Sequence, residues 1–303
     1  TVLGFIRACK KDIAAFRPDV IIFIDNSGFN LRIAKWAKAQ QYKTHYYISP
    51  QVWASRAGRV KTIKATIDHM YVILPFVKDF YDKHQYPVHF VGHPLIDAIS
   101  GRTQAKYAVF YKEHHLDTRP IIALLPGSRK QEINAMLSVM LSVIDDYPDY
   151  QFVIAGAPSQ EPSFYQPFLK NSQVRLIMNK TYDILSFANA ALVTSGTATL
   201  EAALFKVPQV VCYKGSWISY EIAKRIIKLE YISLVNLIMN KPVVTELIQN
   251  EFTTKTLKAS LNQILDDYHR AKLFLDYYDL EKKLGGRGAS AKTAKLIVEY
   301  SSL

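Results

Sequence analysis

One segment of the chain combines small residues and a carboxylate in a spacing that could hold a nucleotide. Ser195-Gly196-Thr197 follows the apolar run 191–194 and precedes a helical pattern that carries Glu201 one turn further along. Free backbone amides at the start of a helix attract phosphate, and a carboxylate one turn deeper can accept both hydroxyls of a ribose. The alternative interpretation is an ordinary helix N-cap with Glu201 on the surface. The apolar neighbours of Glu201 favour the functional interpretation.

A second segment, Pro126-Gly127-Ser128-Arg129, follows the apolar run 121–125 and precedes a helical pattern from about residue 130. Gly127 would let the backbone approach a ligand closely, Ser128 is expected to cap the helix, and Arg129 supplies a two-pronged cation for phosphate. A capped helix start with a surface arginine explains the same residues. This segment alone does not decide between the two.

Asp25 stands at the end of the apolar run 20–24, where the carboxylate of a buried strand would reach a ligand site and could act as a general base. Asp25-Asn26-Ser27-Gly28 is equally a good turn and N-cap sequence. His45 and His93 are expected to be hydrogen-bonded structural histidines rather than the base. Asn236 is an amide in an apolar stretch, so its partners are either backbone groups or a ligand.

Several chemistries lack their sequence signals. No Gly-Lys-Ser/Thr follows either loop at Walker spacing, and Gly285-Gly286-Arg287-Gly288 follows a helical rather than a strand pattern. Kinases and dehydrogenases are therefore disfavoured. The two cysteines, Cys9 and Cys212, lie far apart without ligands at metal spacing, and no Asp-x-Asp could seat a divalent ion beneath a diphosphate. We expect no metal and no cofactor.

The chain is basic, with 38 Lys and Arg against 26 Asp and Glu and a net charge of +12, so an anionic partner is expected. Two basic stretches interleaved with aromatic and aliphatic residues, 49–67 and 214–228, resemble interfacial helices. The alternative is an amphipathic helix that packs on its own sheet. No apolar run reaches the roughly 18 residues needed to span a bilayer, so we expect a soluble or peripheral protein. The candidate membrane contacts are Trp53, Arg56, Arg59, Trp217, Lys224 and Arg225.

The elements that must position these residues alternate between strands and helices, which is typical of α/β proteins with parallel sheets. Nine strands are expected: 20–25, 44–48, 70–74, 88–91, 121–125, 152–155, 174–177, 191–194 and 209–213. From about Thr253 the pattern is purely helical. We expect two doubly wound domains, with ligands bound in the cleft between them. The predicted limits are 1–100 for the first domain, 101–119 for a linker, 120–283 for the second domain and 284–303 for a helix that packs back on the first.

As a linked set, the motifs resemble the lipid-A-disaccharide synthase family over about residues 12–250. The segments that carry the resemblance are Phe16–Val20, Ile24–Asn30, His45–Ala54, Leu74–Phe76, Phe90–Pro94, Leu124–Arg129, Thr194–Glu201 and Tyr231–Leu237. The resemblance implies a GT-B fold and an inverting, metal-independent transfer of 2,3-diacylglucosamine. UDP-2,3-diacylglucosamine would be the donor, 2,3-diacylglucosamine 1-phosphate the acceptor, and UDP and the β-linked disaccharide phosphate the products.

The resemblance also implies roles for individual residues. Asp25 would activate the primary hydroxyl of the acceptor, Arg129 and the Ser195-Gly196-Thr197 amides would steady the leaving diphosphate, Glu201 would bind the ribose, and Asn236 would lie in the donor site. The nucleotide site as a whole would comprise Gly127, Ser128, Arg129, Ser195, Gly196, Thr197, Glu201 and Asn236. We expect a cytoplasmic protein, peripheral on the inner membrane of a Gram-negative bacterium, that is a monomer or a homodimer and does not bind nucleic acid.

The chain departs from the family pattern at two places. Family members open with a strand and a Gly-Glu-Ala/Thr-Ser-Gly-Asp loop that this sequence does not contain, so we expect a segment upstream of Thr1. Asp25-Asn26-Ser27-Gly28 also replaces the usual Asp-Ala/Ser-Pro-Asp. Two alternatives to the synthase stay open. One is another enzyme on the same fold, a UDP-N-acetylglucosamine epimerase or a murein lipid-intermediate transferase. The other is a non-catalytic basic protein that binds membranes or RNA.

Overall fold

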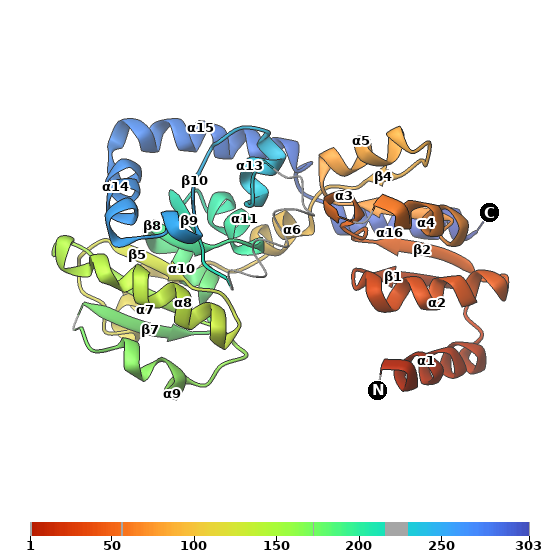
Figure 1. Cartoon of the computed structure of the whole chain (residues 1–303), viewed down its shortest axis with the longest axis horizontal. Helices are drawn as coiled ribbons and strands as arrows, with labels where there is room; N and C mark the ends of the chain where they lie inside the picture. The colour runs from red at the N-terminus through yellow and green to blue at the C-terminus, as the bar shows by residue number, and fades with distance from the viewer. Residues whose placement is uncertain (1, 56, 172, 216–229, 303) are drawn as a thin grey trace. The chain divides into compact units, whose positions relative to one another are not determined.

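The computed structural model describes residues 2–55, 57–171, 173–215 and 230–302. These residues form two compact units (Figure 1). The first unit comprises residues 2–100 and 282–302, and the second comprises 101–215 and 230–281. Each unit is built on a parallel sheet with helices on both faces, so the predicted α/β class is confirmed.

The first unit has a four-stranded parallel sheet in the order β1-β2-β3-β4. Its strands are β1 (Val20–Ile24), β2 (Lys43–Tyr47), β3 (His69–Val72) and β4 (His89–Phe90). Its helices are α1 (Val2–Phe16), α2 (Ser27–Ala39), α3 (Val52–Ser55), the 3-10 helix η1 (Ala57–Arg59), α4 (Val60–Thr66), α5 (Pro75–Lys83), α6 (Pro94–Ser100) and α16 (Ala289–Ser301).

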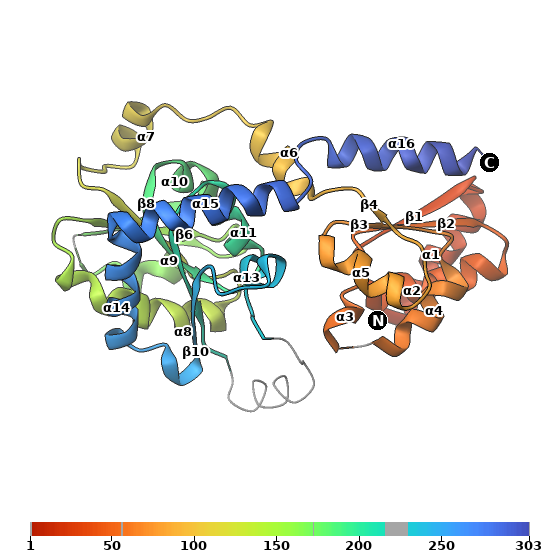
Figure 2. The same ribbon diagram turned by 90° about the horizontal axis from the view of Figure 1, so that it is seen from above.

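Helices α2 and α4 cover one face of this sheet, and α16 lies on the other (Figure 2). The start of α16 is held by Asp97, whose carboxylate accepts hydrogen bonds from the amides of Gly288 at 2.6 Å and Ser290 at 2.9 Å. Near the end of α16, the ring of Tyr300 stacks on His69 with centroids 4.2 Å apart. The C-terminal helix therefore packs on the first unit.

The side of the sheet at β1 is apolar and open to solvent. Within the described residues β1 pairs only with β2, and its side chains Ile22 and Ile24 are 42% and 56% exposed. Helix α1 packs beside α2, but Ile6 is its only buried residue and Phe16 is 82% exposed. Helix α1 is amphipathic, and most of its apolar face is uncovered.

The second unit has a six-stranded parallel sheet. Its strands are β5 (Ile121–Leu125), β6 (Gln151–Gly156), β7 (Val174–Met178), β8 (Ala188–Thr194), β9 (Gln209–Tyr213) and β10 (Thr245–Ile248). Its helices are α7 (Tyr107–Glu113), α8 (Lys130–Met140), η2 (Leu141–Asp146), α9 (Pro162–Tyr165), η3 (Gln166–Phe168), α10 (Thr181–Phe187), α11 (Thr197–Leu204), α13 (Leu234–Met239), η4 (Gln249–Glu251), α14 (Thr254–Leu265) and α15 (Asp267–Lys283).

The strand order of this sheet, β10-β9-β8-β5-β6-β7, is that of a doubly wound Rossmann fold. The chain moves outward in one direction from β5 and returns to β8 on its other side. The loops that follow β5 and β8 therefore diverge to opposite faces and leave a crevice at the carboxyl ends of these two strands. Both strands are almost completely buried, as their continuous apolar runs predicted.

All nine predicted strands are present, with ends that differ by at most three residues. The tenth strand, β10, was missed because Thr245-Glu246-Leu247-Ile248 is short and contains a charged residue. Residues 101–119, expected to form a linker, belong to the second unit. The reason is that α7 buries Phe110 and Tyr111 in the core of that unit, against Ile121 and Ile184.

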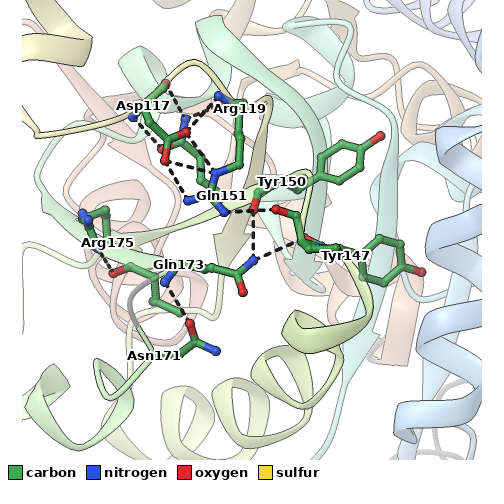
Figure 3. A network of polar contacts seen from close by, with 10 residues as sticks. Asp117, Arg119, Tyr147, Tyr150, Gln151, Asn171, Gln173 and Arg175 are labelled. Carbon is green, nitrogen blue, oxygen red and sulfur yellow. Dashed lines mark hydrogen bonds and ion pairs between the residues drawn. The ribbon is translucent and has the colours of Figure 1, made fainter.

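The amino-terminal edge of the second sheet is held by a polar network (Figure 3). The buried amide of Gln151 donates to the carbonyl of Asp117 at 2.9 Å, and the Arg119 guanidinium donates to both carboxylate oxygens of Asp117. The amide of Gln173 donates to the carbonyls of Tyr147 and Tyr150 at 3.3 Å each. Since these polar groups bond one another, the ligand site is expected at the opposite, carboxyl-terminal edge.

Candidate functional site

A cavity of about 330 Å³ opens at the carboxyl ends of β5 and β8 in the second unit. It brings together the two loops that the sequence singled out separately, one after each strand. From the β5 side it is lined by Gly127 and Ser128, and from the β8 side by Ser195, Gly196, Thr197 and Glu201. The remaining lining residues are Leu125, Glu132, Ala155, Ala157, Pro158, Thr181, Thr194 and Ala198.

The loop after β8 presents backbone amides to this cavity. Gly196 is the N-cap residue of α11 and has φ +155°, a conformation that a residue with a side chain rarely adopts. Over the residues that the structure describes, the amides of Gly196, Thr197 and Ala198 have no acceptor. The Ser195 amide, by contrast, donates to the carbonyl of Cys212 at 3.2 Å. The amides of this loop that could donate to an anion are therefore those from Gly196 onward, whereas the Ser195 amide already has a partner within the protein.

The loop after β5 has a similar design. Gly127 has φ +100°, and a Cβ at this position would lie 2.9 Å from the carboxylate of Glu132. Helix α8 starts at Lys130 as predicted, but its N-cap residue is Arg129, and no side chain caps it. The predicted cap by Ser128 is therefore wrong, because the extended backbone of Arg129 takes the N-cap position. The carbonyl of Ser128 accepts from Ser159 at 3.0 Å and Gln160 at 2.8 Å, which fixes this loop.

Arg129 and Glu132 give the mouth of the cavity both signs of charge. The Arg129 side chain is 81% exposed, and its Nη1 lies 3.5 Å from Glu132 Oε1, a long contact for an ion pair. Arg129 is not among the residues that line the cavity, and its side chain is mostly exposed to solvent. Its predicted contact with a diphosphate stays a prediction.

Glu201 lines the cavity and is half-buried, in agreement with its apolar neighbours in the sequence. Burial raises the pKa of this carboxyl, and a hydrogen bond from the Tyr182 hydroxyl to Oε1, 3.0 Å long, partly opposes that shift. Tyr182 comes from α10, on a different part of the chain. Nothing in the sequence pattern around Tyr182 could have indicated this contact, because it depends on the packing of α10 beside α11.

Thr194 is a further residue that the sequence did not reveal. It is the last residue of β8, it is only 8% exposed, and it lines the cavity. Its hydroxyl has no hydrogen-bond partner in the part of the chain that the structure describes. A buried hydroxyl without a protein partner is a natural contact for a ligand or a bound water.

Asn236 is not among the residues that line the cavity. It is 1% exposed, and its Nδ2 donates to the carbonyl of Val244 and to Glu246 Oε1, each at 2.9 Å. Its Oδ1 accepts from the amide of Val244 at 2.9 Å. The sequence left open whether this amide bonds to the protein or to a ligand. In the structure its partners belong to the protein.

Asp25 lies in the first unit, in the loop between β1 and α2, and its side chain is exposed. Asp25 and Asn26 have φ values of +46° and +37°, two consecutive residues in the left-handed region. The Asn30 side chain holds this loop by donating to the carbonyls of Ile24 at 3.0 Å and Asp25 at 2.8 Å, and the hydroxyl of Tyr46 also donates to the Asp25 carbonyl. Such strained backbone held by several hydrogen bonds is characteristic of functional loops.

The two histidines are structural, as predicted. His45 is fully buried with Nδ1 2.8 Å from the Tyr71 hydroxyl, and Nδ1 of the buried His93 accepts from the amide of Leu95 at 3.2 Å. Burial lowers the pKa of each to about 4, so both are neutral at physiological pH. Neither histidine is among the residues that line the cavity of the second unit.

Of the six membrane-contact candidates, two are described by the structure. Trp53 in α3 is half-buried, with its ring edge-on to Phe76 at 4.8 Å, and Arg59 is half-buried at the start of α4. The rest of that basic stretch, α4, buries Val60 and Ile63, as the alternative of packing on its own unit requires. The other candidates, Arg56, Trp217, Lys224 and Arg225, lie outside the described residues.

The described residues contain neither a membrane-spanning helix nor a metal-binding cluster. Among residues 2–55, 57–171, 173–215 and 230–302, no helix is both long and apolar enough to cross a membrane. Over the same ranges, no group of three or more His, Cys, Asp or Glu side chains is arranged to hold a metal ion.

The architecture and the cavity define the class of the protein. Two solved structures share its fold: UDP-GlcNAc 2-epimerase from Neisseria meningitidis bound to UDP-GlcNAc, at a TM-score of 0.68, and S. aureus MnaA with UDP, at 0.69. Both are 14% identical to this chain; the first match covers 98% of this chain and 81% of the other, and the second covers 100% and 81%. The chain has the GT-B fold, as predicted.

The sequence comparisons identify the family. A family model described as lipid-A-disaccharide synthetase matches residues 1–299. Relatives called lipid-A-disaccharide synthase include that of Geobacter metallireducens, 39% identical over 96% of this chain and 77% of its own length, and that of Coxiella burnetii strain CbuG_Q212, 38% identical over 96% and 78%. The chain belongs to the lipid-A-disaccharide synthase family, the glycosyltransferases of lipid A biosynthesis. The resemblance stated from the motifs is confirmed.

Proposed function

We propose that the chain transfers 2,3-diacylglucosamine from UDP to 2,3-diacylglucosamine 1-phosphate, and so produces UDP and the β-linked disaccharide phosphate precursor of lipid A. The observation that carries the proposal is the cavity at the β5 and β8 ends, where the two family motifs predicted to bind the nucleotide line one space. A doubly wound sheet binds its ligand at this point, where the strand order reverses.

In the proposed reaction, Asp25 takes the proton of the acceptor's primary hydroxyl. The oxygen of that hydroxyl bonds at the same time to the anomeric carbon of the donor. The bond from that carbon to the UDP oxygen breaks, and the electron pair leaves with UDP. The amides of Gly196 and Thr197, together with Arg129, stabilise the negative charge that grows on the diphosphate. Glu201 holds the ribose, and Asn236 supports the donor site from inside the protein through its bonds to Val244 and Glu246.

A turnover assay with the acylated donor and acceptor tests the proposal. We expect UDP and the disaccharide phosphate to form in equal amounts, and no reaction with unacylated UDP-N-acetylglucosamine. Epimerisation of UDP-N-acetylglucosamine would instead support the alternative enzyme on the same fold. Failure of the folded chain to use any sugar nucleotide would refute the proposal.

The binding of UDP is expected to depend on the protonation of Glu201. Because burial raises the pKa of this carboxyl, UDP affinity should fall as the pH drops through that raised pKa, where the protonated group accepts fewer hydrogen bonds. Tyr182→Phe removes a hydrogen bond that favours the charged form, so the fall should begin at a higher pH. Calorimetric titrations from pH 5 to pH 8 measure this effect, because this range lies above the ordinary pKa of a glutamate, about 4.3.

The control for this experiment is Tyr268→Phe, which changes a tyrosine on α15 that is 78% exposed. UDP titrates in the same way in every sample, so only a difference between the variants reports on the protein. Superimposable pH profiles for the parent and Tyr182→Phe would contradict the coupling between Tyr182 and Glu201.

We further propose that the chain binds peripherally to the cytoplasmic face of the inner membrane, in a Gram-negative bacterium, where its lipid substrates reside. The net charge of +12 supports this proposal. We also propose that two copies associate as a homodimer, which sedimentation velocity tests directly.

Vesicle binding is expected to depend on anionic lipid and on salt. The chain should cosediment with vesicles that contain phosphatidylglycerol more than with pure phosphatidylcholine, and less as ionic strength rises. Arg59→Glu should weaken binding several-fold, since each basic residue near an anionic surface contributes about 1 kcal/mol. Lys255→Glu makes the same charge change at an exposed site in the second unit. Equal losses for both variants would show that only net charge matters.

A further inference from the structure

The side chain of Glu246, in the strand that the sequence did not predict, is bonded in an unusual way. Its Oε2 accepts from the amide of Ile232, and its Oε1 accepts from the amide of Ser233 and from Nδ2 of Asn236, with all three distances 2.9 Å. A carboxylate that accepts several N–H donors is among the strong hydrogen-bonding arrangements in proteins. Glu246 therefore fixes the backbone at residues 232 and 233.

The same backbone holds the nucleotide loop. The hydroxyl of Ser195, a cavity-lining residue, donates to the carbonyl of Ile232 at 2.9 Å. The Ser195 amide is tied to Cys212 at the end of β9, so this residue is anchored on two sides. Because the only hydrogen of the Ser195 hydroxyl points inward to Ile232, the residue cannot also donate it to a ligand.

We propose that Glu246 is a positioning residue for the diphosphate: it fixes Ile232, Ile232 fixes Ser195, and Ser195 sets the direction of the free amides of Gly196 and Thr197. The inference rests on the proposed function, since it assumes that these amides face a nucleotide. It also gives a role to the motif around Asn236, which bonds Glu246 and the backbone of Val244 and lines no part of the cavity. Glu246 itself touches no ligand in this arrangement.

Glu246→Gln tests the proposal because it keeps the size of the side chain and replaces one acceptor oxygen by an NH₂ group. That group would face backbone N–H donors and could accept from none of them. We expect UDP to bind about tenfold more weakly, in line with the loss of part of a charged hydrogen-bond network. Glu246→Asp keeps the carboxylate but shortens it, and its UDP affinity should lie between that of Glu246→Gln and the parent. Glu251→Gln, at an exposed glutamate of the adjacent η4, is the matched control and should bind UDP as the parent does.

A double-mutant cycle with Ser195→Ala separates positioning from a general effect on stability. If Glu246 acts through Ser195, then Glu246→Gln should weaken UDP binding far less in the Ser195→Ala background than in the parent. Full additivity of the two losses would overturn the proposal, as would parent-like UDP affinity in both Glu246→Gln and Glu246→Asp. If the parent itself does not bind UDP, the proposed function fails rather than the role of Glu246. Thermal unfolding of each variant confirms that the folded protein is being compared.

Discussion

Asp25→Asn should lower kcat by about 10²- to 10⁴-fold, the usual contribution of a general base, while UDP binds as tightly as before. Asparagine has the shape of aspartate but cannot take the proton of the acceptor hydroxyl. The loop itself should survive the change, because Asn30 and Tyr46 hold the main-chain carbonyl of residue 25 and not its side chain. Asparagine also tolerates the left-handed conformation that this position requires, φ +46°.

The control for this variant is Asp19→Asn, which alters an exposed aspartate just before β1, at the opposite end of the strand from Asp25. It should leave kcat unchanged. Steady-state turnover with saturating acylated donor and acceptor measures the effect, and calorimetry with UDP shows whether the second unit is intact. A kcat for Asp25→Asn within a few-fold of the parent would exclude Asp25 as the base.

Glu201→Ala should weaken UDP binding by roughly 100-fold or more, because two hydrogen bonds from the ribose to a charged acceptor are lost and each contributes roughly 1.5–3 kcal/mol. The position of Glu201 in the cavity and its orientation by Tyr182 are the grounds for this expectation. Calorimetric titration with UDP gives the affinities. Glu113→Ala, at an exposed glutamate on α7, is the control and should bind UDP normally.

A second ligand makes this test specific for the ribose. The parent should bind 2′-deoxy-UDP more weakly than UDP, and Glu201→Ala should bind the two ligands about equally. If Glu201→Ala still prefers UDP over the deoxy ligand as strongly as the parent does, then another group contacts the 2′-hydroxyl. The prediction that Glu201 binds the ribose would then be wrong.

The sequence was most informative where a buried strand ends in small residues. The loops at Gly127 and Gly196 could be predicted because an apolar run followed by glycine, a polar residue and a helix has few structural solutions. Their convergence in one cavity could not, since it follows from the order β8-β5 in the sheet, and strand order is not encoded in any local pattern.

Two of the features that the sequence did not reveal, the bonds of Tyr182 and of Glu246, have a common physical cause, which is contact between residues that are not neighbours in the sequence. Tyr182 and Glu201 are 19 positions apart in the sequence, and the three N–H donors of Glu246 come from residues 10 to 14 positions before it. The failure of Ser128 as a helix cap has a local cause instead. Arg129 adopts the extended N-cap backbone, and the Ser128 carbonyl is bonded to Ser159 and Gln160.

The open side of β1 has a consequence for the first sheet. In the described part of the chain this strand has unpaired main-chain groups on one side, next to the exposed side chains of Ile22 and Ile24. Helix α1 presents further exposed apolar residues. Another β-strand can add at such an edge, so this is the place where the four-stranded sheet can be extended.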